Sequence, residues 1–492
     1  MFNFLKTDEK TLSVTARYVA VAVWAASLVG CVSTAGINPK AKNMPAAQLQ
    51  AGQTIKLAPH IEWPAIDWWK AYHDQQLNAL IDKALSDSPN LSMAKSRVDL
   101  VQAYADSTHA DMRPNISGDA SAVRQRFTEL QFIPPPSAGN WDWDNKMTAS
   151  IAYDLDLWGR QESLWHASLD EVNATKLEVQ QVKLELIGAI TKSYIQLAMQ
   201  YQLRNLAEAH LSEIKQRLAI QQRSLKAGLS TTMEVVEAET PIPLAKAKIE
   251  AIDERIKLLD NQLAALSGQG PGAGDSITRP TMTLDANAGL PDTLQANLVG
   301  RRPDVLAHRF HVEAAQENIE GAKKAFYPNI NLIGFIGFQA LGFGQLISSA
   351  AGIAGAGPAI SLPIFDGGRR RGNLSAKTAS YDIAVERYNA VLIKALQEVS
   401  DQLLMMQSNG KQIQEVDNAL ALAKKAHHLA QMSYKGGLSN YQHVLETDSV
   451  VIRQQELMTQ LLAARLDAYA GLMCALGGGT VDEATAKVLS LP

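Results

Sequence analysis

Long stretches of helically spaced apolar residues dominate this chain. From Gly159-Arg160 to about residue 223 the apolar positions follow a helical period, which at 1.5 Å per residue predicts a helix on the order of 95 Å long. No ordinary globular core needs a helix of that length. Pro241 and Pro243 predict a kink or the end of a segment. A coiled-coil seam with steps of three and four follows, at Ile249, Ile252, Ile256, Leu259, Leu263 and Leu266.

A shorter stretch has a period of two. Between Trp143 and Trp158, apolar residues alternate with mostly polar ones, at Met147, Ala149, Ile151, Tyr153, Leu155 and Leu157. This alternation predicts a strand with one apolar and one polar face. The pattern fits two structures equally well. One is a strand of a membrane barrel with its polar face to the lumen, and the other is an amphipathic strand of a soluble sandwich.

The whole plan occurs twice. The stretch Ser224–Glu239 recurs as Ser433–Asp448, with seven identical positions at one offset. Upstream, Pro328-Asn329-Ile330 repeats Pro114-Asn115-Ile116. Glycines in the repeated stretch predict a tight reversal, so each copy reads as the tip of a helical hairpin. Two matching copies indicate an internal duplication.

Each half therefore predicts helix, strand, loop, strand, long helix, tip and long helix. The expected strands are about 115–127, 146–157, 329–339 and 358–366, and the tips are 224–232 and 433–441. The expected domains are a signal peptide 1–30, a lead-in 31–66, a first repeat 67–267, a linker or equatorial region 268–300, a second repeat 301–476 and a tail 477–492. Four strands are too few to close a barrel, and an open sheet edge has unpaired N–H and C=O groups in lipid. If these strands span a membrane, several chains must share one barrel.

The N-terminus predicts export and lipidation. Basic residues precede a short apolar run, Tyr18–Val29, which ends in Leu28-Val29-Gly30-Cys31. This ending resembles the bacterial lipobox, so Cys31 is expected to become the lipidated first residue. By resemblance to lipoprotein sorting rules, the absence of Asp after Cys31 favours the outer membrane. Cys474 then has no disulfide partner and is assigned to the core.

Other chemistry finds little support in the sequence. The formal net charge is −4, which gives no general attraction to nucleic acid. No His-Glu-x-x-His or Cys-x-x-Cys motif is present, so neither a metal site nor a cofactor is expected, and neither is an enzyme. His427-His428 is assigned to a solvated face. Arg369-Arg370-Arg371 follows a strand and is assigned to the headgroup level of a membrane.

Several motifs together resemble the outer membrane factor family, the TolC-like channels, in the lipoprotein form found in tripartite efflux systems. They are the lipobox, Asp67-Trp68-Trp69, Gly300-Arg301-Arg302-Pro303-Asp304-Val305, Ala325-Phe326-Tyr327-Pro328-Asn329-Ile330 and the duplicated Gly-Leu-Ser tips. The resemblance implies a mixed α and β membrane protein. It implies a homotrimer with a twelve-stranded outer-membrane barrel continued by a coiled-coil helical barrel in the periplasm. The implied partners are outer-membrane lipid, a periplasmic adaptor and an inner-membrane pump of the RND or MFS type.

The resemblance also assigns roles to residues at the tips, where four acids follow the turns: Glu234, Glu237, Glu446 and Asp448. Glu446 matches an acidic ring at the periplasmic aperture, while a second acidic position of some relatives is His443 here. Tyr434 and Glu234 match residues that lock the tip shut in some relatives, but the Arg that completes one such lock is Ser439. Contact with the adaptor is implied at Gly228, Leu229, Ser230, Gly437, Leu438 and Ser439.

Three interpretations remain open. The chain can be a passive exit duct for drugs or other small toxic molecules, or the same duct serving type I protein secretion. A periplasmic coiled-coil scaffold without a pore is the third, but it leaves the alternating strand unexplained. The lipobox and the Arg-Arg-Pro-Asp motif favour efflux. A solvated helix-face charge is the alternative reading for Glu446.

Overall fold

The computed structural model describes residues 33–44, 64–130, 132–133, 135–283 and 302–479. Contacts divide the chain into two compact units. The first unit comprises Met1–Asn43, Val98–Ala174 and Arg309–Arg387, and the second comprises Met44–Arg97, Thr175–His308 and Tyr388–Pro492. The predicted signal peptide, Cys31 and most of the predicted tail lie outside the described residues.

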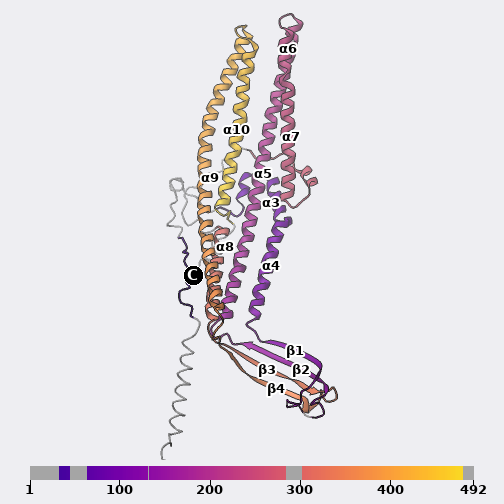
Figure 1. The fold of residues 1–492 in the computed structure, drawn as a ribbon. Helices are drawn as coiled ribbons and strands as arrows, with labels where there is room; N and C mark the ends of the chain where they lie inside the picture. Colours follow the sequence, from indigo (N-terminus) through magenta and orange to yellow (C-terminus); the bar gives the residue numbers. More distant parts are fainter. Residues whose placement is uncertain (1–32, 45–63, 131, 134, 284–301, 480–492) are drawn as a thin grey trace, which may run out of the picture. The chain divides into compact units, whose positions relative to one another are not determined.

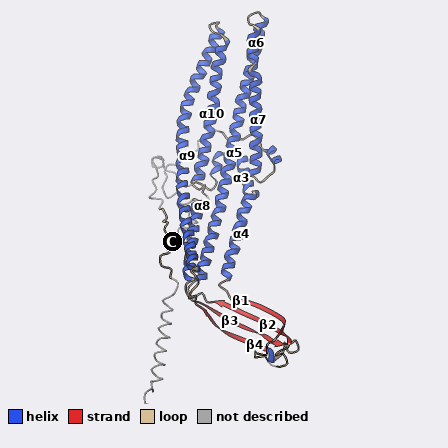
Figure 2. Ribbon diagram, in the orientation of Figure 1, coloured by secondary structure: helices blue, strands red, loops and turns tan. Residues whose placement is uncertain are grey.

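Helices and strands follow the order that the duplicated pattern predicts (Figure 1, Figure 2). The α-helices are α3 (Gln75–Asp87), α4 (Pro89–Ala110), α5 (Arg160–Lys226), α6 (Thr232–Glu239), α7 (Pro241–Leu266), α8 (Pro303–Lys324), α9 (Arg369–Lys435) and α10 (Tyr441–Ala475). The strands are β1 (Asn115–Arg126), β2 (Trp141–Asp154), β3 (Asn329–Leu341) and β4 (Gly352–Ser361). Short 3-10 helices are η2 (Trp68–Tyr72), η3 (Pro271–Ser276) and η5 (Ser349–Ala351). Among the described helices, none combines the length and the apolar character that crossing a membrane requires.

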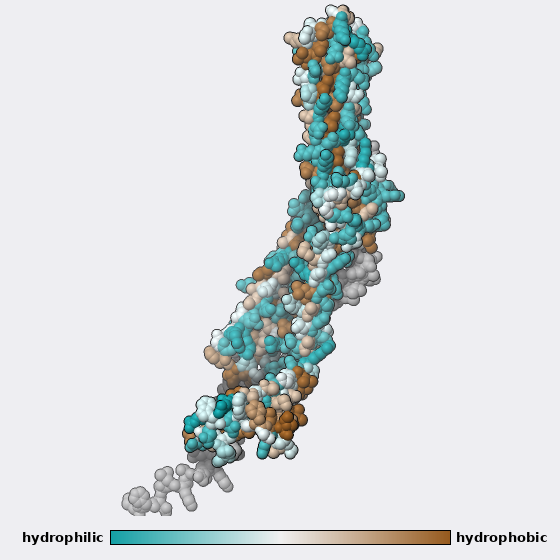
Figure 3. Space-filling view, turned by 90° about the vertical axis from the view of Figure 1, so that its right-hand side faces the viewer, coloured by the Kyte–Doolittle hydropathy of each residue, from teal (hydrophilic) through white to brown (hydrophobic). Residues whose placement is uncertain are grey.

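The first unit contains one antiparallel sheet in the order β1-β2-β3-β4. All of β1 is exposed, and exposed positions alternate with partly exposed ones along β4. Figure 3 shows hydrophobic side chains gathered on the visible face of this region. The outer edges of β1 and β4 have no strand partner within the described residues.

Two strands begin earlier than the sequence predicts. β2 begins at Trp141 rather than about 146, because residues 141–145 continue the register with β1, pairing Trp141 with Arg126. β4 spans 352–361 rather than 358–366. Its Gly-rich start looked like a loop, since Gly is a poor strand former. Gly355 lies opposite Phe335, and a Cβ at Gly355 would be 2.8 Å from that ring, so the glycine accommodates the aromatic side chain.

The lead-in is held against α9 within the first unit. The backbone N–H groups of Lys40 and Ala41 donate to Asp382 Oδ1 at 2.8 and 2.9 Å. Ile37 packs on a small core formed by α8 and α9, which contains Ile319, Ala322 and Leu374. Residues 37, 40 and 41 are thus bound to the two helices that flank β3 and β4 in the sequence.

The second unit contains two helical hairpins, α5 with α6 and α7, and α9 with α10 (Figure 1). Pro241 is the first residue of α7, a position whose backbone N–H makes no hydrogen bond within the helix. The proline therefore separates α6 from α7 in the returning arm of the first hairpin. The largest core cluster packs η2 and α3 against both hairpins. Its largest fully buried side chains include Leu77, Ile81, Ile190, Tyr194, Ile195, Leu197, Leu259 and Leu263. Cys474 packs against this cluster, as the sequence predicts for a core cysteine.

Candidate functional site

Both hairpin tips end their first helix in the same way. A 2.8 Å backbone bond spans each turn, from Leu229 N to Ser224 O and from Leu438 N to Ser433 O. The glycines before these leucines have φ values of 73° and 70°, at Gly228 and Gly437. The left-handed glycine and the backbone hydrogen bond that spans the turn together form a Schellman motif. Glycine adopts the left-handed conformation without strain. The repeated Gly-Leu pattern therefore encodes one helix-ending geometry twice.

The two tips present a leucine to the outside. Leu229 is 83% exposed and Leu438 is 86% exposed. The neighbouring serines differ, because Ser230 Oγ donates to Glu234 Oε2 at 2.7 Å, whereas Ser439 Oγ donates to the Asn440 carbonyl at 3.1 Å. An exposed large apolar side chain on each tip is a feature that a docking surface uses.

Glu234 has a local structural role in this chain. Its carboxylate accepts from the Thr231 backbone N–H at 2.8 Å, and Thr231 Oγ1 accepts from Glu234 N at 3.3 Å, which forms a capping box at the start of α6. The Ser230 hydroxyl and the Thr231 N–H lower the pKa of Glu234 below its usual value. Tyr434 instead lies against Tyr441, with ring centroids 5.3 Å apart. The contacts described for Glu234 are thus with its own tip and not with Tyr434.

Glu446 lies near the start of α10, which begins at Tyr441. Its side chain is 62% exposed, and its Oε2 lies 3.7 Å from Nδ1 of His443. Val444, between them in sequence, is buried and fixes which face of α10 points outward. His443 therefore accompanies the Glu446 carboxylate on the exposed face, at the position where some relatives have a second acid.

A partly buried charge cluster links the two hairpins and is formed by His210, Glu213, Arg217, His427 and Asp448. Arg217 Nη2 on α5 lies 3.4 Å from Asp448 Oδ2 on α10, and both side chains are less than a tenth exposed. Arg217 also forms an ion pair with Glu213. His427 Nε2 on α9 lies 3.8 Å from Asp448 Oδ1. Within this cluster the Arg217 guanidinium carries the positive charge that compensates two carboxylates.

Burial and unpaired atoms give this cluster its electrostatic character. Burial lowers the pKa of His210, although its Nδ1 lies 3.7 Å from Asp448 Oδ2. In the described part of the chain neither His210 Nδ1 nor Arg217 Nη1 has a hydrogen-bond partner. The donor atoms of His210, Glu213 and Asp448 lie within 4.8 Å of one another, as a metal site requires. Because the guanidinium already contacts both carboxylates, we assign a structural link rather than a metal site.

The sequence analysis named Asp448 but missed its partners. His427 was assigned to a solvated face, which is wrong: its side chain is 15% exposed and contacts the cluster, while His428 is exposed. One signal was available, because Asp448 is one helical turn beyond the apolar Val444 and so shares its buried face. The Arg217 partner comes from the other hairpin and has no signal in local periodicity.

The Arg-Arg-Pro-Asp motif ties the start of α8 and the end of α10 to the middle of α9. Arg302 donates to both oxygens of Asp304, from Nε at 3.0 Å and from Nη2 at 2.7 Å. Its Nη1 donates to Glu398 on α9 at 2.7 Å and to the Ala475 carbonyl at the end of α10 at 2.9 Å. Burial disfavours the charge on Arg302, but these carboxylates keep its pKa raised. The motif is therefore a structural joint at the base of the second hairpin.

Known proteins share this sequence and fold. The model of the outer membrane efflux protein family matches residues 80–269 and 294–478. Fusaric acid resistance protein FusA of Burkholderia cepacia is 39% identical over 371 residues, which are 73% of this chain and 69% of FusA. Multidrug resistance outer membrane protein MdtP of Escherichia coli strain K12 is 29% identical over 455 residues, 88% of this chain and 91% of MdtP. The crystal structure of outer membrane protein VceC of Vibrio cholerae is similar with a TM-score of 0.79 and 33% identity, covering 85% of this chain and 100% of that one.

The long hairpins, the four-stranded sheet and these matches define an outer-membrane channel of the efflux type. The chain belongs to the outer membrane efflux protein family. It is a non-enzymatic channel component of efflux located in the outer membrane, which confirms the predicted family, function and location. The comparisons give no support to the protein-secretion alternative.

Proposed function

We propose that three copies of this chain form a passive exit duct for drugs or other small toxic molecules. The observation that carries the proposal is the open sheet, whose edge strands β1 and β4 have no partner within the described residues. Backbone groups at such edges cannot remain unpaired in lipid, so β4 of one copy pairs with β1 of the next. Three copies give twelve strands, as the family resemblance implies.

The periplasmic aperture of this duct is formed by the second hairpin. Glu446 is exposed on α10 beside His443, and three copies around an axis bring three such carboxylates together. Like charges at close range repel, and a bound cation relieves that repulsion. The ring then narrows the resting duct and favours cations. Tyr434 and Glu234 support this closure by fixing the conformations of their own tips.

Conductance in planar lipid bilayers tests the aperture. Glu446→Ala is expected to raise the resting conductance several-fold and to weaken block by a trivalent cation. Glu237→Ala is the matched control, since Glu237 is exposed and holds the equivalent position in the first repeat. Unaltered conductance and unaltered block in Glu446→Ala would place the constriction elsewhere and leave Glu446 as a solvated charge.

The exposed tips are the docking surface for a periplasmic adaptor. Leu229 and Leu438 project from tips of identical geometry, with Gly228, Ser230, Gly437 and Ser439 beside them. An adaptor bound there connects the duct to an inner-membrane pump of the RND or MFS type. FusA and MdtP are named for fusaric acid resistance and multidrug resistance, which supports small toxic molecules as the transported class.

Lipidation at Cys31 completes the proposed assembly. The lipobox precedes a lead-in whose residues 40 and 41 are bonded to α9. One lipid contributes only modestly to membrane attachment, in addition to the contribution of the barrel. Mass spectrometry of the mature N-terminus should find acylated Cys31, and an unmodified Cys31 in a chain that starts elsewhere would exclude the anchor.

A further inference from the structure

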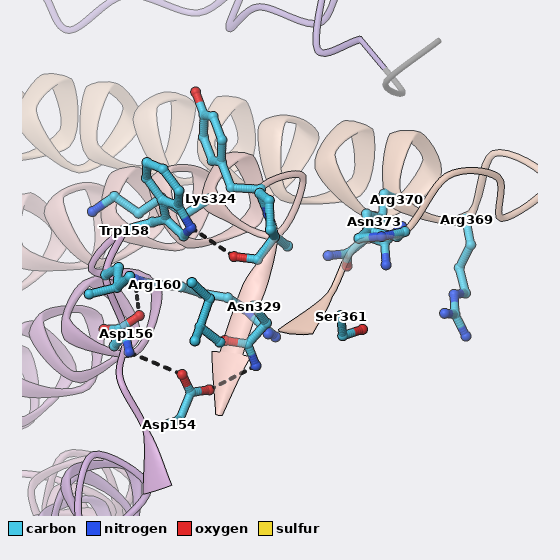
Figure 4. A pocket seen from close by; sticks show the side chains of 16 residues that line it. Asp154, Asp156, Trp158, Arg160, Lys324, Asn329, Ser361, Arg369, Arg370 and Asn373 are labelled. Atoms are coloured by element: carbon cyan, nitrogen blue, oxygen red, sulfur yellow. Dashed lines mark hydrogen bonds between the residues drawn. The ribbon is translucent and has the colours of Figure 1, made fainter. Parts of the chain in front are cut away.

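A polar cavity of about 550 Å³ lies in the first unit where the strands meet the long helices. Its walls are the end of β2 with the start of α5, the end of α8 with the start of β3, and the end of β4 with the start of α9. In Figure 4, Trp158 and Arg160 lie on one side, Arg369 and Arg370 lie on the other, and Asn329 and Ser361 are between them. None of the aperture residues lines this cavity.

The acids in the cavity are already bound to N–H donors. Asp154 accepts from Asp156 N at 3.0 Å and from Asn329 Nδ2 at 3.1 Å. Asp156 caps α5, accepting from Arg160 N at 2.6 Å and from Glu162 N at 3.0 Å. These bonds, drawn in part in Figure 4, hold both carboxylates in place. Within the described residues, neither acid forms an ion pair with a cation that lines the cavity.

Three of the four cations that line the cavity lack a carboxylate partner. Arg370 pairs with Asp366 at 3.1 Å. Lys324 Nζ donates to two neutral acceptors, Gly159 O at 3.1 Å and Ser163 Oγ at 2.8 Å, and forms no ion pair within the described residues. For Arg160 and Arg369, no side-chain hydrogen bond or ion pair is formed within the described residues. The cavity thus offers unpaired positive charge on opposite sides, which suits an anion.

Two observations set the position of this cavity relative to a bilayer. β2 and β4 end there and β3 begins there, so it marks the boundary of the sheet that lies in the membrane. Arg371, next to the lining residue Arg370, donates to the carbonyl oxygens of Ser33 and of Ala35, the latter at 3.1 Å. Ser33 follows the lipidation residue Cys31 by two positions in the chain. The segment that follows the proposed anchor is therefore bonded beside the cavity.

An aromatic pair at the cavity has the character of a membrane interface. The rings of Trp158 and Tyr327 are stacked with centroids 5.0 Å apart, and both side chains are about half exposed. Trp158 Nε1 donates to the Pro328 carbonyl at 2.7 Å, which fixes the ring (Figure 4). Half-exposed aromatic rings beside basic residues are typical of the headgroup level in barrel proteins.

We propose that this cavity binds the phosphate-bearing headgroup of an anionic phospholipid from the periplasmic leaflet of the outer membrane. Arg160 and Arg369 contact the phosphate from opposite sides, and Lys324 adds positive charge at the base of α5. The acyl chains then lie along the sheet, beside the Trp158–Tyr327 pair. This inference rests on the proposed barrel and lipid anchor, which give the cavity its level in the membrane.

Lipid titration of the whole purified assembly tests the site. Delipidated protein in detergent is titrated with phosphatidylglycerol and followed by native mass spectrometry. Saturable binding is expected, and Arg160→Gln with Arg369→Gln should weaken it roughly 30-fold, since each basic residue near lipid contributes about 1 kcal/mol. The matched control, Arg124→Gln with Arg126→Gln, removes two arginines from the far end of β1 and should bind like wild type.

Two further arms separate the possible outcomes. Complete competition by inorganic phosphate at equal concentration would identify a free-anion site and overturn the lipid proposal, as would unchanged binding in the cavity variant. The single variant Arg369→Gln repeats the test with less risk to folding. Conductance is measured in parallel: channels that conduct like wild type but bind no phosphatidylglycerol refute this site alone, whereas an assembly that forms no channels refutes the proposed function.

Discussion

Arg217 Nη2 lies 3.4 Å from Asp448 Oδ2, and the pair joins the outgoing helix of the first hairpin to the returning helix of the second. Removing one partner of a buried ion pair leaves a charge without compensation, which is far more costly than losing a surface pair. The pair lies near the tips and links α5 to α10 within one chain. We call this link the latch, because a duct that opens by separating the two hairpins would have to break it.

Breaking this latch should open the resting duct. Arg217→Ala leaves Asp448 and Glu213 facing each other without the guanidinium, so the hairpins should separate and the resting conductance should rise several-fold in planar bilayers. Arg204→Ala is the control, because Arg204 pairs with Asp253 at 2.5 Å within the first hairpin only. A rise in both variants, or in neither, would show that the link between hairpins does not hold the duct closed.

Arg302 should dominate the stability of the second hairpin base. Arg302→Ala leaves Glu398 and Asp304 without their shared cation, and we expect the free energy of unfolding to fall by ~3–5 kcal/mol. Arg302→Lys should restore only part of this stability, because lysine lacks the planar guanidinium that forms several hydrogen bonds at once. Arg309→Ala removes an exposed pair with Glu313 and should cost under about 1 kcal/mol. Thermal unfolding followed by circular dichroism measures the difference; equal midpoints for the two alanine variants would contradict it.

The buried carboxyl of Asp467 should make the stability of the protein fall as the pH rises. Burial raises its pKa to about 6, although Gln196 Nε2 donates to it at 2.5 Å. The folded protein thus holds a proton that the unfolded chain releases near pH 4, so stability falls as pH rises through this window. Asp467→Asn removes the buried charge. It should raise the free energy of unfolding by up to ~3 kcal/mol at pH 7.5 and by only ~1 kcal/mol near pH 4.5.

The unfolding midpoint at the two pH values measures this effect. Asp417→Asn changes an exposed carboxylate on α9 and should leave the midpoint unchanged. A destabilised Asp467→Asn, or an equal gain at both pH values, would mean that the carboxylate is not held in its neutral form by burial.

Charged replacements at the tips should abolish efflux without disturbing the assembly. Leu229→Glu with Leu438→Glu places a carboxylate at each docking leucine, and desolvating these charges opposes an apolar contact. Drug accumulation in cells lacking the native gene measures efflux, and outer-membrane fractions measure assembly. Met233→Glu changes an exposed residue of α6 beyond the first tip and serves as control. Normal efflux in the double variant would show that the tips are only turns.

Periodicity predicted most of the fold because helices and turns are local. The seam from Ile249 to Leu266 and the glycine at each tip follow from the sequence alone, and the duplication made each half a check on the other. The strand ends were less predictable. Gly355 weakens a strand signal in isolation, and only its position opposite Phe335 explains why a glycine is there.

The charge cluster shows what local patterns leave out. The acid at Asp448 was identifiable from its place after the second turn, yet its partner Arg217 and the nearby His427 come from other helices. Periodicity assigns a face to each residue but does not specify which helix covers that face. The structural role of Arg302 was hidden for the same reason, since its partners Glu398 and Ala475 are distant in sequence.

The mass of the detergent-solubilised assembly shows most directly whether several chains share one barrel. Four strands per chain with open edges at β1 and β4 require partners, so we expect the mass of three chains, each of at most 53.4 kDa, with full β content by circular dichroism. A protein with full β content and the mass of one chain would contradict the shared barrel and with it the proposed duct.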